Sequence, residues 1–205
     1  MIAHPQSLSP QAYLAWEEEQ SLKYEYINGQ VVAMTGGTLA HNSIALNLAA
    51  ALKNHLRGKN CKVFMADAKV GITATNSFLY PDVVVTCDRR DQTARKIINY
   101  PCLIVEVLSP GTEALDRGQK FRNYRQIETL QEYVLIDAEQ INIERYCLNE
   151  NGKWELTTYP VGQFELASDR QKDLLPNQKI EFSSVSFNCA IALLYEDVVF
   201  ADESL

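Results

Sequence analysis

The chain of 205 residues contains no apolar run near the ~20 residues that a membrane-spanning helix requires. Its N-terminal stretch, MIAHPQSLSPQAYLAWEEEQ, has neither a basic start nor an apolar segment, so we expect no secretion signal. The sequence also has no Gly-Lys-Ser/Thr phosphate loop, no nucleophile elbow and no dinucleotide-binding fingerprint. We therefore expect a cytoplasmic protein with no membrane partner, whose chemistry does not use any of these three motifs.

Cysteine is scarce and its count is odd, which argues against a disulfide framework. The five residues are Cys61, Cys87, Cys102, Cys147 and Cys189. No two of them are close enough in sequence to form a metal-binding knuckle, and all but the last lie in or beside apolar runs. The pattern predicts buried, reduced thiols.

Positive charge is also in deficit, since the formal net charge is −7 at pH 7. This argues against a protein that holds nucleic acid by charge alone, because such binding depends on neutralising phosphates. It is compatible with an enzyme that meets DNA in a local basic groove and uses acidic residues to hold metal. A dense basic patch could contact phosphates or could be a solvated loop; it consists of Arg89, Arg90, Arg95 and Lys96.

Helix signals are present in the first quarter of the chain. A helix is expected to begin at Pro10 and to carry Glu17 on its solvated side. The Asn28-Gly29 pair between two β-rich runs predicts a hairpin. A second helix is expected over residues 38–56, where leucine and isoleucine recur with helical period.

Strand signals dominate the rest. They cover residues 61–66, 68–72, 79–87, 102–110, 132–137, 141–150 and 153–160. We expect the first two to pair, and a helix over 113–127 to follow the fourth. Because no repeat or linker interrupts the pattern, we predict one domain over 1–205, with an α/β (α+β) fold in which helices flank a mixed central sheet. Its core would span about 20–140, with a strand-rich extension over about 141–205.

Two acidic residues stand inside apolar strand signals, Asp82 in YPDVVV and Glu106 in LIVEVL. A carboxylate in such surroundings is costly unless it is paired or bound to a cation. Two carboxylates on neighbouring strand ends would also repel each other, and a divalent cation between them removes both problems. The alternative is that each acid reaches solvent or a basic partner.

The helix expected over residues 113–127 carries a mixed polar and apolar face. Asp116, Lys120, Tyr124 and Ile127 follow one another at spacings of four, four and three, so they share that face. Since the face ends apolar, it should point at the sheet and direct Lys120 towards the end of the Glu106 strand. A lysine beside metal-held carboxylates can orient an attacking water and balance phosphate charge. The alternative is an ordinary Asp116–Lys120 surface ion pair.

The segments YPDVVV, LIVEVLSPGTEALDRGQKFRNY and EYVLID resemble the PD-(D/E)XK nuclease superfamily, and within it the Uma-type restriction endonuclease family. The resemblance extends over residues 24–137 and implies a restriction-endonuclease-like fold and metal-dependent cleavage of DNA. It implies that Asp82 and Glu106 hold the metal ion, Mg²⁺ or Mn²⁺. The superfamily pattern expects a lysine two residues after Glu106, where this chain has Leu108. The Uma-type pattern supplies a lysine from the following helix instead, at the position of Lys120.

Two further residues are candidates for this site. The resemblance places an acidic residue near the metal at Glu25; the alternative is a solvated strand residue. His41 opens the second expected helix and could contact the scissile phosphate or a ligand water, or could simply be a hydrogen-bonding residue at a helix start. A helix N-terminus would favour neutral imidazole, which accepts a proton.

The leading functional hypothesis is a Mg²⁺-dependent endonuclease that hydrolyses phosphodiester bonds in DNA. One alternative is a non-catalytic nucleic-acid- or protein-binding module on the same fold, and another is a hydrolase of a different phosphate ester. Because cutting both strands usually requires two active sites, a homodimer is expected. The apolar segment over residues 185–200 could form its interface or could complete the core.

Overall fold

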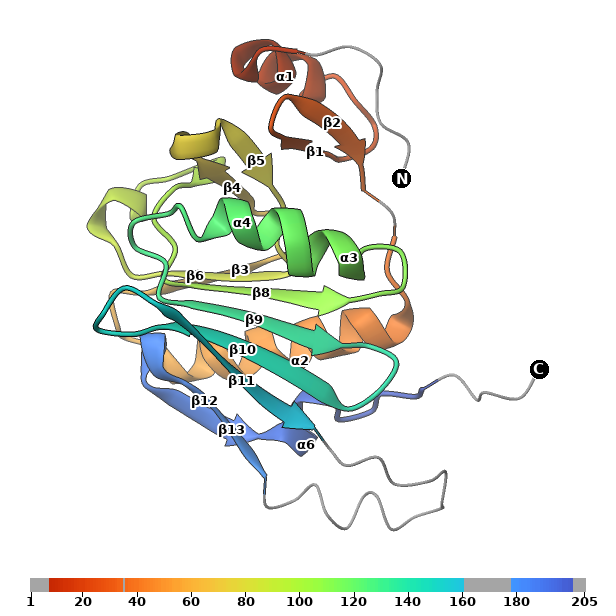
Figure 1. Ribbon diagram of the computed structural model, residues 1–205, viewed down its shortest axis with the longest axis vertical. Helices are drawn as coiled ribbons and strands as arrows, with labels where there is room; N and C mark the ends of the chain where they lie inside the picture. Colours follow the sequence, from red (N-terminus) through yellow and green to blue (C-terminus); the bar gives the residue numbers. More distant parts are fainter. Residues whose placement is uncertain (1–7, 35, 161–177, 201–205) are drawn as a thin grey trace, which may run out of the picture.

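A mixed six-stranded sheet forms the centre of the molecule (Figure 1). The computed structural model describes residues 8–34, 36–160 and 178–200. The strands lie in the order β11-β10-β9-β8-β6-β3; β8 and β9 pair in parallel and the other neighbours pair antiparallel. Their bounds are β3 Lys62–Met65, β6 Val83–Thr86, β8 Leu103–Leu108, β9 Glu132–Asp137, β10 Asn142–Leu148 and β11 Trp154–Pro160. The mixed α+β architecture predicted from the sequence is confirmed.

A second sheet of five short strands lies beside the first, in the order β2-β1-β5-β4-β7. These strands are β1 Tyr24–Ile27, β2 Gln30–Ala33, β4 Lys69–Ile72, β5 Ser77–Leu79 and β7 Ile97–Ile98. The predicted hairpin is its edge, where Asn28 and Gly29 both take positive φ in the turn between β1 and β2. A two-stranded sheet of β12 Lys179–Phe182 and β13 Phe187–Ala190 follows near the C-terminus.

Helices cover both faces of the six-stranded sheet (Figure 1). α2 Leu39–His55 lies on one face, and α3 Glu113–Leu115 and α4 Phe121–Tyr124 lie on the other. Two further helices lie outside this layer: α1 Pro10–Glu17 packs against β1, and α6 Ile191–Leu194 packs against α2. A π-helical turn over Asp116–Lys120 joins α3 to α4, so the helix expected over 113–127 consists of three consecutive pieces. None of the described helices is long and apolar enough to cross a membrane.

The side chains of β8 alternate between two hydrophobic clusters, as the twofold period of a strand requires. Leu103, Val105 and Val107 pack in the cluster that contains α2. Ile104 and Leu108 pack in the cluster that contains the end of α4. Glu106 shares their parity, so its carboxylate lies on the face that α3, the π turn and α4 cover.

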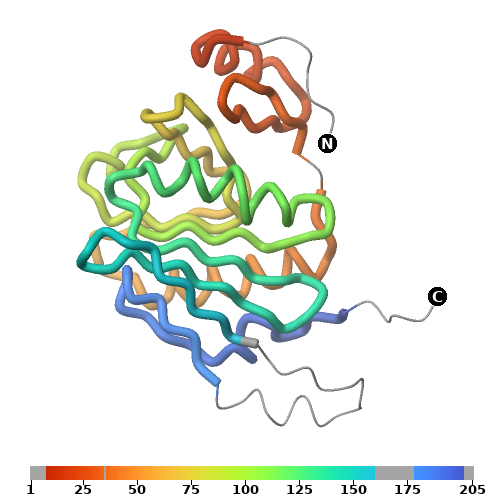
Figure 2. The backbone as a smooth tube through the Cα atoms, in the orientation of Figure 1, coloured from red at the N-terminus to blue at the C-terminus, as the bar shows by residue number. Residues whose placement is uncertain are grey.

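The C-terminal segment completes the core on the α2 side of the sheet. Ile180, Phe182, Ile191 and Leu194 are fully buried in the same cluster as α2. Figure 2 shows this segment, in blue, at the opposite end of the molecule from the N-terminal hairpin, in red. Of the two roles considered for residues 185–200, the structure therefore supports completion of the core.

The expected pairing of residues 61–66 with 68–72 is wrong. β3 pairs with β6 in the six-stranded sheet, whereas β4 pairs with β5 and β7 in the other. Ala66 lies in the left-handed region at φ 54° and directs the chain from one sheet to the next. The sequences of β3 and β4 both have the pattern of a strand, and this pattern does not indicate which strands they pair with. The sequence therefore does not distinguish a β3–β4 hairpin from two strands in different sheets.

The prediction of reduced thiols is wrong for two of the five cysteines, because Cys61 and Cys87 form a disulfide. Cys61 directly precedes β3 and Cys87 directly follows β6, and the register that pairs Lys62 with Thr86 places the two cysteines opposite each other. The remaining three thiols, Cys102, Cys147 and Cys189, are free, and Cys102 and Cys189 are buried as predicted.

Candidate functional site

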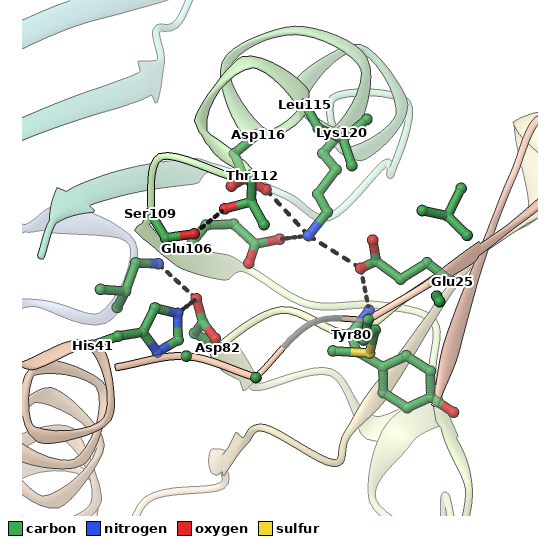
Figure 3. Close-up of a pocket in the computed structure, with 16 residues that line it drawn as sticks. Glu25, His41, Tyr80, Asp82, Glu106, Ser109, Thr112, Leu115, Asp116 and Lys120 are labelled. Carbon is green, nitrogen blue, oxygen red and sulfur yellow. Dashed lines mark hydrogen bonds and ion pairs between the residues drawn. The ribbon is translucent and has the colours of Figure 1, made fainter. Parts of the chain in front are cut away.

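All five site residues predicted from the sequence line one pocket (Figure 3). They are Glu25, His41, Asp82, Glu106 and Lys120. Each comes from a different part of the fold: β1, the first turn of α2, the residue before β6, the middle of β8 and the π turn. The pocket therefore lies where the two sheets, α2 and the α3–α4 segment meet.

Strand pairing brings Asp82 beside Glu106. β6 and β8 are antiparallel with Val83 opposite Val105, so the residues just before and just after that pair lie next to each other. The Val107 amide donates a 2.7 Å hydrogen bond to Oδ2 of Asp82, which fixes this carboxylate at the end of β6. The two acids predicted to share a site are therefore neighbours.

Lys120 projects from the π turn into a group of three carboxylates (Figure 3). Its Nζ lies 3.1 Å from Oε1 of Glu25, 3.2 Å from Oε1 of Glu106 and 3.1 Å from Oδ1 of Asp116. Only 7% of the lysine side chain is exposed, and the three acids are exposed by 5% or less. This burial excludes the alternative of a surface Asp116–Lys120 pair.

Three further residues, which the sequence did not predict as site residues, contact Lys120, Glu106 or Glu25. Besides Asp116, the Tyr124 hydroxyl donates a 2.9 Å hydrogen bond to Oε1 of Glu106, and the Tyr80 amide donates one of 3.1 Å to Oε1 of Glu25. The sequence does contain a signal for Asp116 and Tyr124, because their spacing of four residues on either side of Lys120 places all three side chains on one helix face. The Tyr80 contact is made by its backbone, and no pattern of side chains indicates such a contact.

The pKa values of the buried pair reflect opposing effects. Burial raises the pKa of Glu106 well above its usual range; Lys120 opposes this, and the charges of Asp116 and Asp82 add to it. Burial lowers the pKa of Lys120, but the charges of Glu106, Glu25 and Asp116 outweigh it and hold that pKa well above the usual value. The lysine therefore stays cationic, whereas burial and the neighbouring acids favour the protonated form of Glu106.

His41 pairs with Asp82, the acidic residue of the pocket that does not contact Lys120. Its Nε2 lies 3.2 Å from Oδ2 of Asp82, while its backbone amide donates to the hydroxyl of Thr38, the N-cap of α2. Burial lowers the pKa of His41, but the hydrogen bond and negative charge of Asp82 outweigh burial and raise it above 6.5. The direction of this shift runs against the expected preference for neutral imidazole, and its cause is the neighbouring Asp82 carboxylate.

A buried polar cluster supports the site from the α1 side. The Tyr80 hydroxyl donates a 2.5 Å hydrogen bond to Oε1 of Glu17, and Lys69 forms an ion pair with the same carboxylate. Glu17 is only 8% exposed, so the expectation that it faces solvent is wrong. Through Tyr80, α1 is thus connected to the backbone group that holds Glu25.

The basic patch over residues 89–96 lies away from the pocket. Its 3₁₀ turn Arg89–Asp91 follows the end of β6, whereas Asp82 precedes the start of that strand. Arg90 pairs with Asp88 and Glu128, and Lys96 pairs with Glu18. Part of the patch is therefore neutralised by local partners, which favours the solvated-loop alternative.

The donor chemistry of the pocket fits a hard divalent cation, which prefers carboxylate oxygens. Four carboxylates face one lysine and one histidine, and Oδ1 of Asp116 is buried without a hydrogen-bond partner among the described residues. In the part of the chain that the structure describes, no three His, Cys, Asp or Glu side chains are placed to hold one ion together. The Lys120 ammonium supplies the positive charge between Glu25 and Glu106 in this arrangement.

Comparisons with known proteins agree with this fold. The model of the Uma2 family, described as "Putative restriction endonuclease", matches residues 10–180. Two proteins of Synechocystis sp. (strain ATCC 27184 / PCC 6803 / Kazusa) are similar in sequence: "Uncharacterized protein slr1290" is 41% identical and "Uncharacterized protein sll1609" is 33% identical. The alignments cover 98% and 77% of this chain, and 100% and 90% of those proteins.

The fold is also similar to that of a protein of solved structure. It is a "putative nuclease belonging to DUF820 from Anabaena variabilis ATCC 29413", with a TM-score of 0.70 and 16% sequence identity. The match covers 92% of this chain and 97% of the other. At this identity the likeness shows the shared fold alone.

Proposed function

Because the chain belongs to the Uma2 family of restriction-endonuclease-like proteins, we propose that it is a metal-dependent endonuclease that hydrolyses phosphodiester bonds in DNA. The observation that carries the proposal is the position of Lys120. Its ammonium reaches Glu106 and Glu25 from a helix, although the superfamily position for lysine is occupied by Leu108. The carboxylates proposed to hold the metal ion and the lysine proposed to orient the attacking water therefore line one pocket.

Asp82 and Glu106 would hold Mg²⁺ or Mn²⁺, assisted by Glu25. A divalent ion held there supplies Lewis-acid chemistry, which stabilises the negative charge that develops on a phosphate. The excess of carboxylates over cationic side chains supports this assignment, because a bound cation would lower their mutual repulsion.

The protein's own groups have separate roles in this proposal. Lys120 donates hydrogen bonds to the attacking water and balances charge on a phosphate oxygen. His41 holds the Asp82 carboxylate in place together with the Val107 amide, and its raised pKa favours the charged imidazolium. We therefore assign His41 the role of orienting Asp82, beside the contact to a phosphate or ligand water expected from the sequence.

The test is cleavage of plasmid DNA with Mg²⁺ or Mn²⁺ by the wild type and by the Asp82→Asn and Glu106→Gln variants. Both substitutions keep the shape of the side chain and remove a charged ligand. We expect each to lower the cleavage rate by more than about a hundredfold, since metal catalysis contributes several kcal/mol. Asp67→Asn is the matched control, because that side chain is 84% exposed and pairs with Lys23 outside the pocket. Wild-type cleavage by the doubly substituted protein would disprove the proposal.

A non-catalytic binding module is the second candidate. It is favoured by the pairing of Glu25, Glu106 and Asp116 with Lys120, which already compensates part of the acidic charge, and by the net charge of −7. Calorimetry with Mn²⁺ separates the two: the nuclease must bind the ion in a way that Asp82→Asn abolishes, and the module need not.

Substrate and assembly can be tested alongside. Incubation with plasmid, single-stranded DNA and RNA in parallel separates a DNA endonuclease from a hydrolase of another phosphate ester. Because cutting both strands usually requires two active sites, we expect a homodimer, and light scattering after gel filtration measures whether it forms.

A further inference from the structure

Asp116 differs from the other two carboxylates that contact Lys120. Glu25 and Glu106 belong to the proposed metal site, so a bound cation would compete with the lysine for both of them. Asp116 is not among the proposed ligands, and its Oδ1 lies 3.1 Å from Nζ of Lys120. Of the three contacts to the lysine, this one would persist unchanged when the ion is bound.

Asp116 is buried, and Lys120 is the cation beside its carboxylate. Its side chain is 2% exposed, and within the described structure its Oδ1 has the Lys120 ion pair as its polar contact, with no hydrogen bond. A buried carboxylate oxygen of this kind is costly unless it serves a nearby cation. The Thr112 side chain also donates a hydrogen bond to the Asp116 carboxylate. Lys120 is therefore the only cationic side chain among the described residues that pairs with it.

The π-helical turn determines where both side chains point. Such turns are rare and occur often at functional sites. Two side-chain donors hold this one: the Tyr133 hydroxyl of β9 donates a 3.0 Å hydrogen bond to the Asp116 carbonyl, and the Asn123 amide donates one of 2.8 Å to the Gln119 carbonyl. Gly118 in its centre lowers the preference for a regular α-helix. The turn thus brings Asp116 and Lys120 into the pocket together (Figure 3).

We propose that Asp116 is a positioning residue that holds the Lys120 ammonium at the reacting phosphate when a metal ion occupies the neighbouring carboxylates. This inference rests on the proposed nuclease function and adds a residue to it. Asp116 acts through Lys120 and does not touch the substrate, and the Tyr133 hydroxyl holds the turn that carries it.

The experiment compares Asp116→Asn with Glu113→Gln, a matched control. Glu113 pairs with Arg117 at the same spacing of four residues, but Glu113 is exposed, Arg117 is half-buried, and neither lines the pocket. We expect Asp116→Asn to lower kcat for plasmid cleavage at least about tenfold, since small displacements of a catalytic group cost this much or more. KM and the Mn²⁺ affinity measured by calorimetry should stay near the wild-type values, and Glu113→Gln should change none of these quantities.

A double variant tests whether Asp116 acts through the lysine. If it does, Asp116→Asn combined with Lys120→Met should cleave no more slowly than Lys120→Met alone. Multiplied losses would overturn the proposal, and so would a loss of Mn²⁺ affinity as large as that of Asp82→Asn, because Asp116 would then be a metal ligand.

A measurement that needs no activity separates this inference from the proposed function. Lys120 should be protected from an amine-reactive reagent in the wild type and in Glu113→Gln, and should react several-fold faster in Asp116→Asn, as measured by mass spectrometry. Tyr133→Phe removes only the hydroxyl that holds the Asp116 carbonyl and should give a smaller increase. Unchanged labelling in both variants overturns the positioning role, whereas a wild type that cleaves no nucleic acid overturns the nuclease.

Discussion

Lys120 donates a 3.2 Å hydrogen bond to Oε1 of Glu106, fourteen residues earlier in the chain. The two residues come from different elements, the π turn and β8, which pack face to face. Leu108, two residues beyond Glu106, is 3% exposed and packs in the hydrophobic cluster on the same face. The amine that contacts Glu106 therefore comes from the π turn, while the position two residues further along β8 is occupied by a core leucine.

Lys120→Met should destabilise the metal-free protein by about 3 kcal/mol at pH 8, because it leaves buried carboxylates without their cation. Without Lys120 the folded-state pKa of Glu106 rises further, and a carboxyl whose folded pKa is raised destabilises the protein as pH rises above its unfolded value. The loss should therefore be smaller at pH 5, where the carboxyls take up protons. Urea unfolding at both pH values measures this.

Lys96→Met is the control for this measurement, since Lys96 forms an exposed pair with Glu18. It should leave the free energy of unfolding nearly unchanged at either pH. An equal destabilisation by Lys120→Met at pH 5 and pH 8 would mean that lost packing, and not charge, is responsible.

The pKa of His41 in the metal-free protein should lie above 6.5 and should fall in Asp82→Asn, which removes the charge beside its Nε2. Since the folded pKa is the raised one, the stabilisation from this pair is fully present below the unfolded pKa near 6.5 and is lost as pH rises through the folded pKa. NMR titration of the imidazole in EDTA, with the signal assigned from His41→Gln, checks this. An unchanged pKa in Asp82→Asn would contradict the pairing.

Gly37→Ala should displace the His41 ring, because a Cβ at position 37 would lie 2.7 Å from its Nδ1 and 2.9 Å from its Cγ. The same addition at Gly36 meets no atom within 4 Å, so Gly36→Ala is the matched control. We expect Gly37→Ala to lower the His41 pKa towards its usual value and to slow cleavage, with Gly36→Ala near wild type in both. If both variants cleave alike, the ring position does not matter for the reaction.

Cys61→Ser should lower the free energy of unfolding by about 3 kcal/mol under oxidising conditions, because the disulfide to Cys87 closes a loop with a sequence separation of 26. Reductant should bring the wild type down to the level of the variant and leave the variant unchanged. Urea unfolding with and without reductant measures the difference, and mass spectrometry of the unreduced protein identifies the linked peptides. A full complement of free thiols would exclude the bond.

Much of the site could be predicted from the sequence because its signals are local. An acid within an apolar strand, a lysine on the sheet-facing side of a helix and a resemblance in order and spacing each depend on residues close together in the chain. These signals point to Asp82, Glu106 and Lys120. The buried β8 and the hairpin at Asn28-Gly29 follow from the same local reasoning.

The contacts that define the site were decided by tertiary structure. The register of β3 against β6 brought Cys61 to Cys87, and the arrangement of α2 against β6 placed His41 on Asp82 and raised its pKa. The periodic pattern determines which side of an element is buried, since that depends only on spacing. Which distant element covers that side depends on packing between segments far apart in sequence, and for this reason the partners of Lys120 and His41 were decided by the tertiary structure.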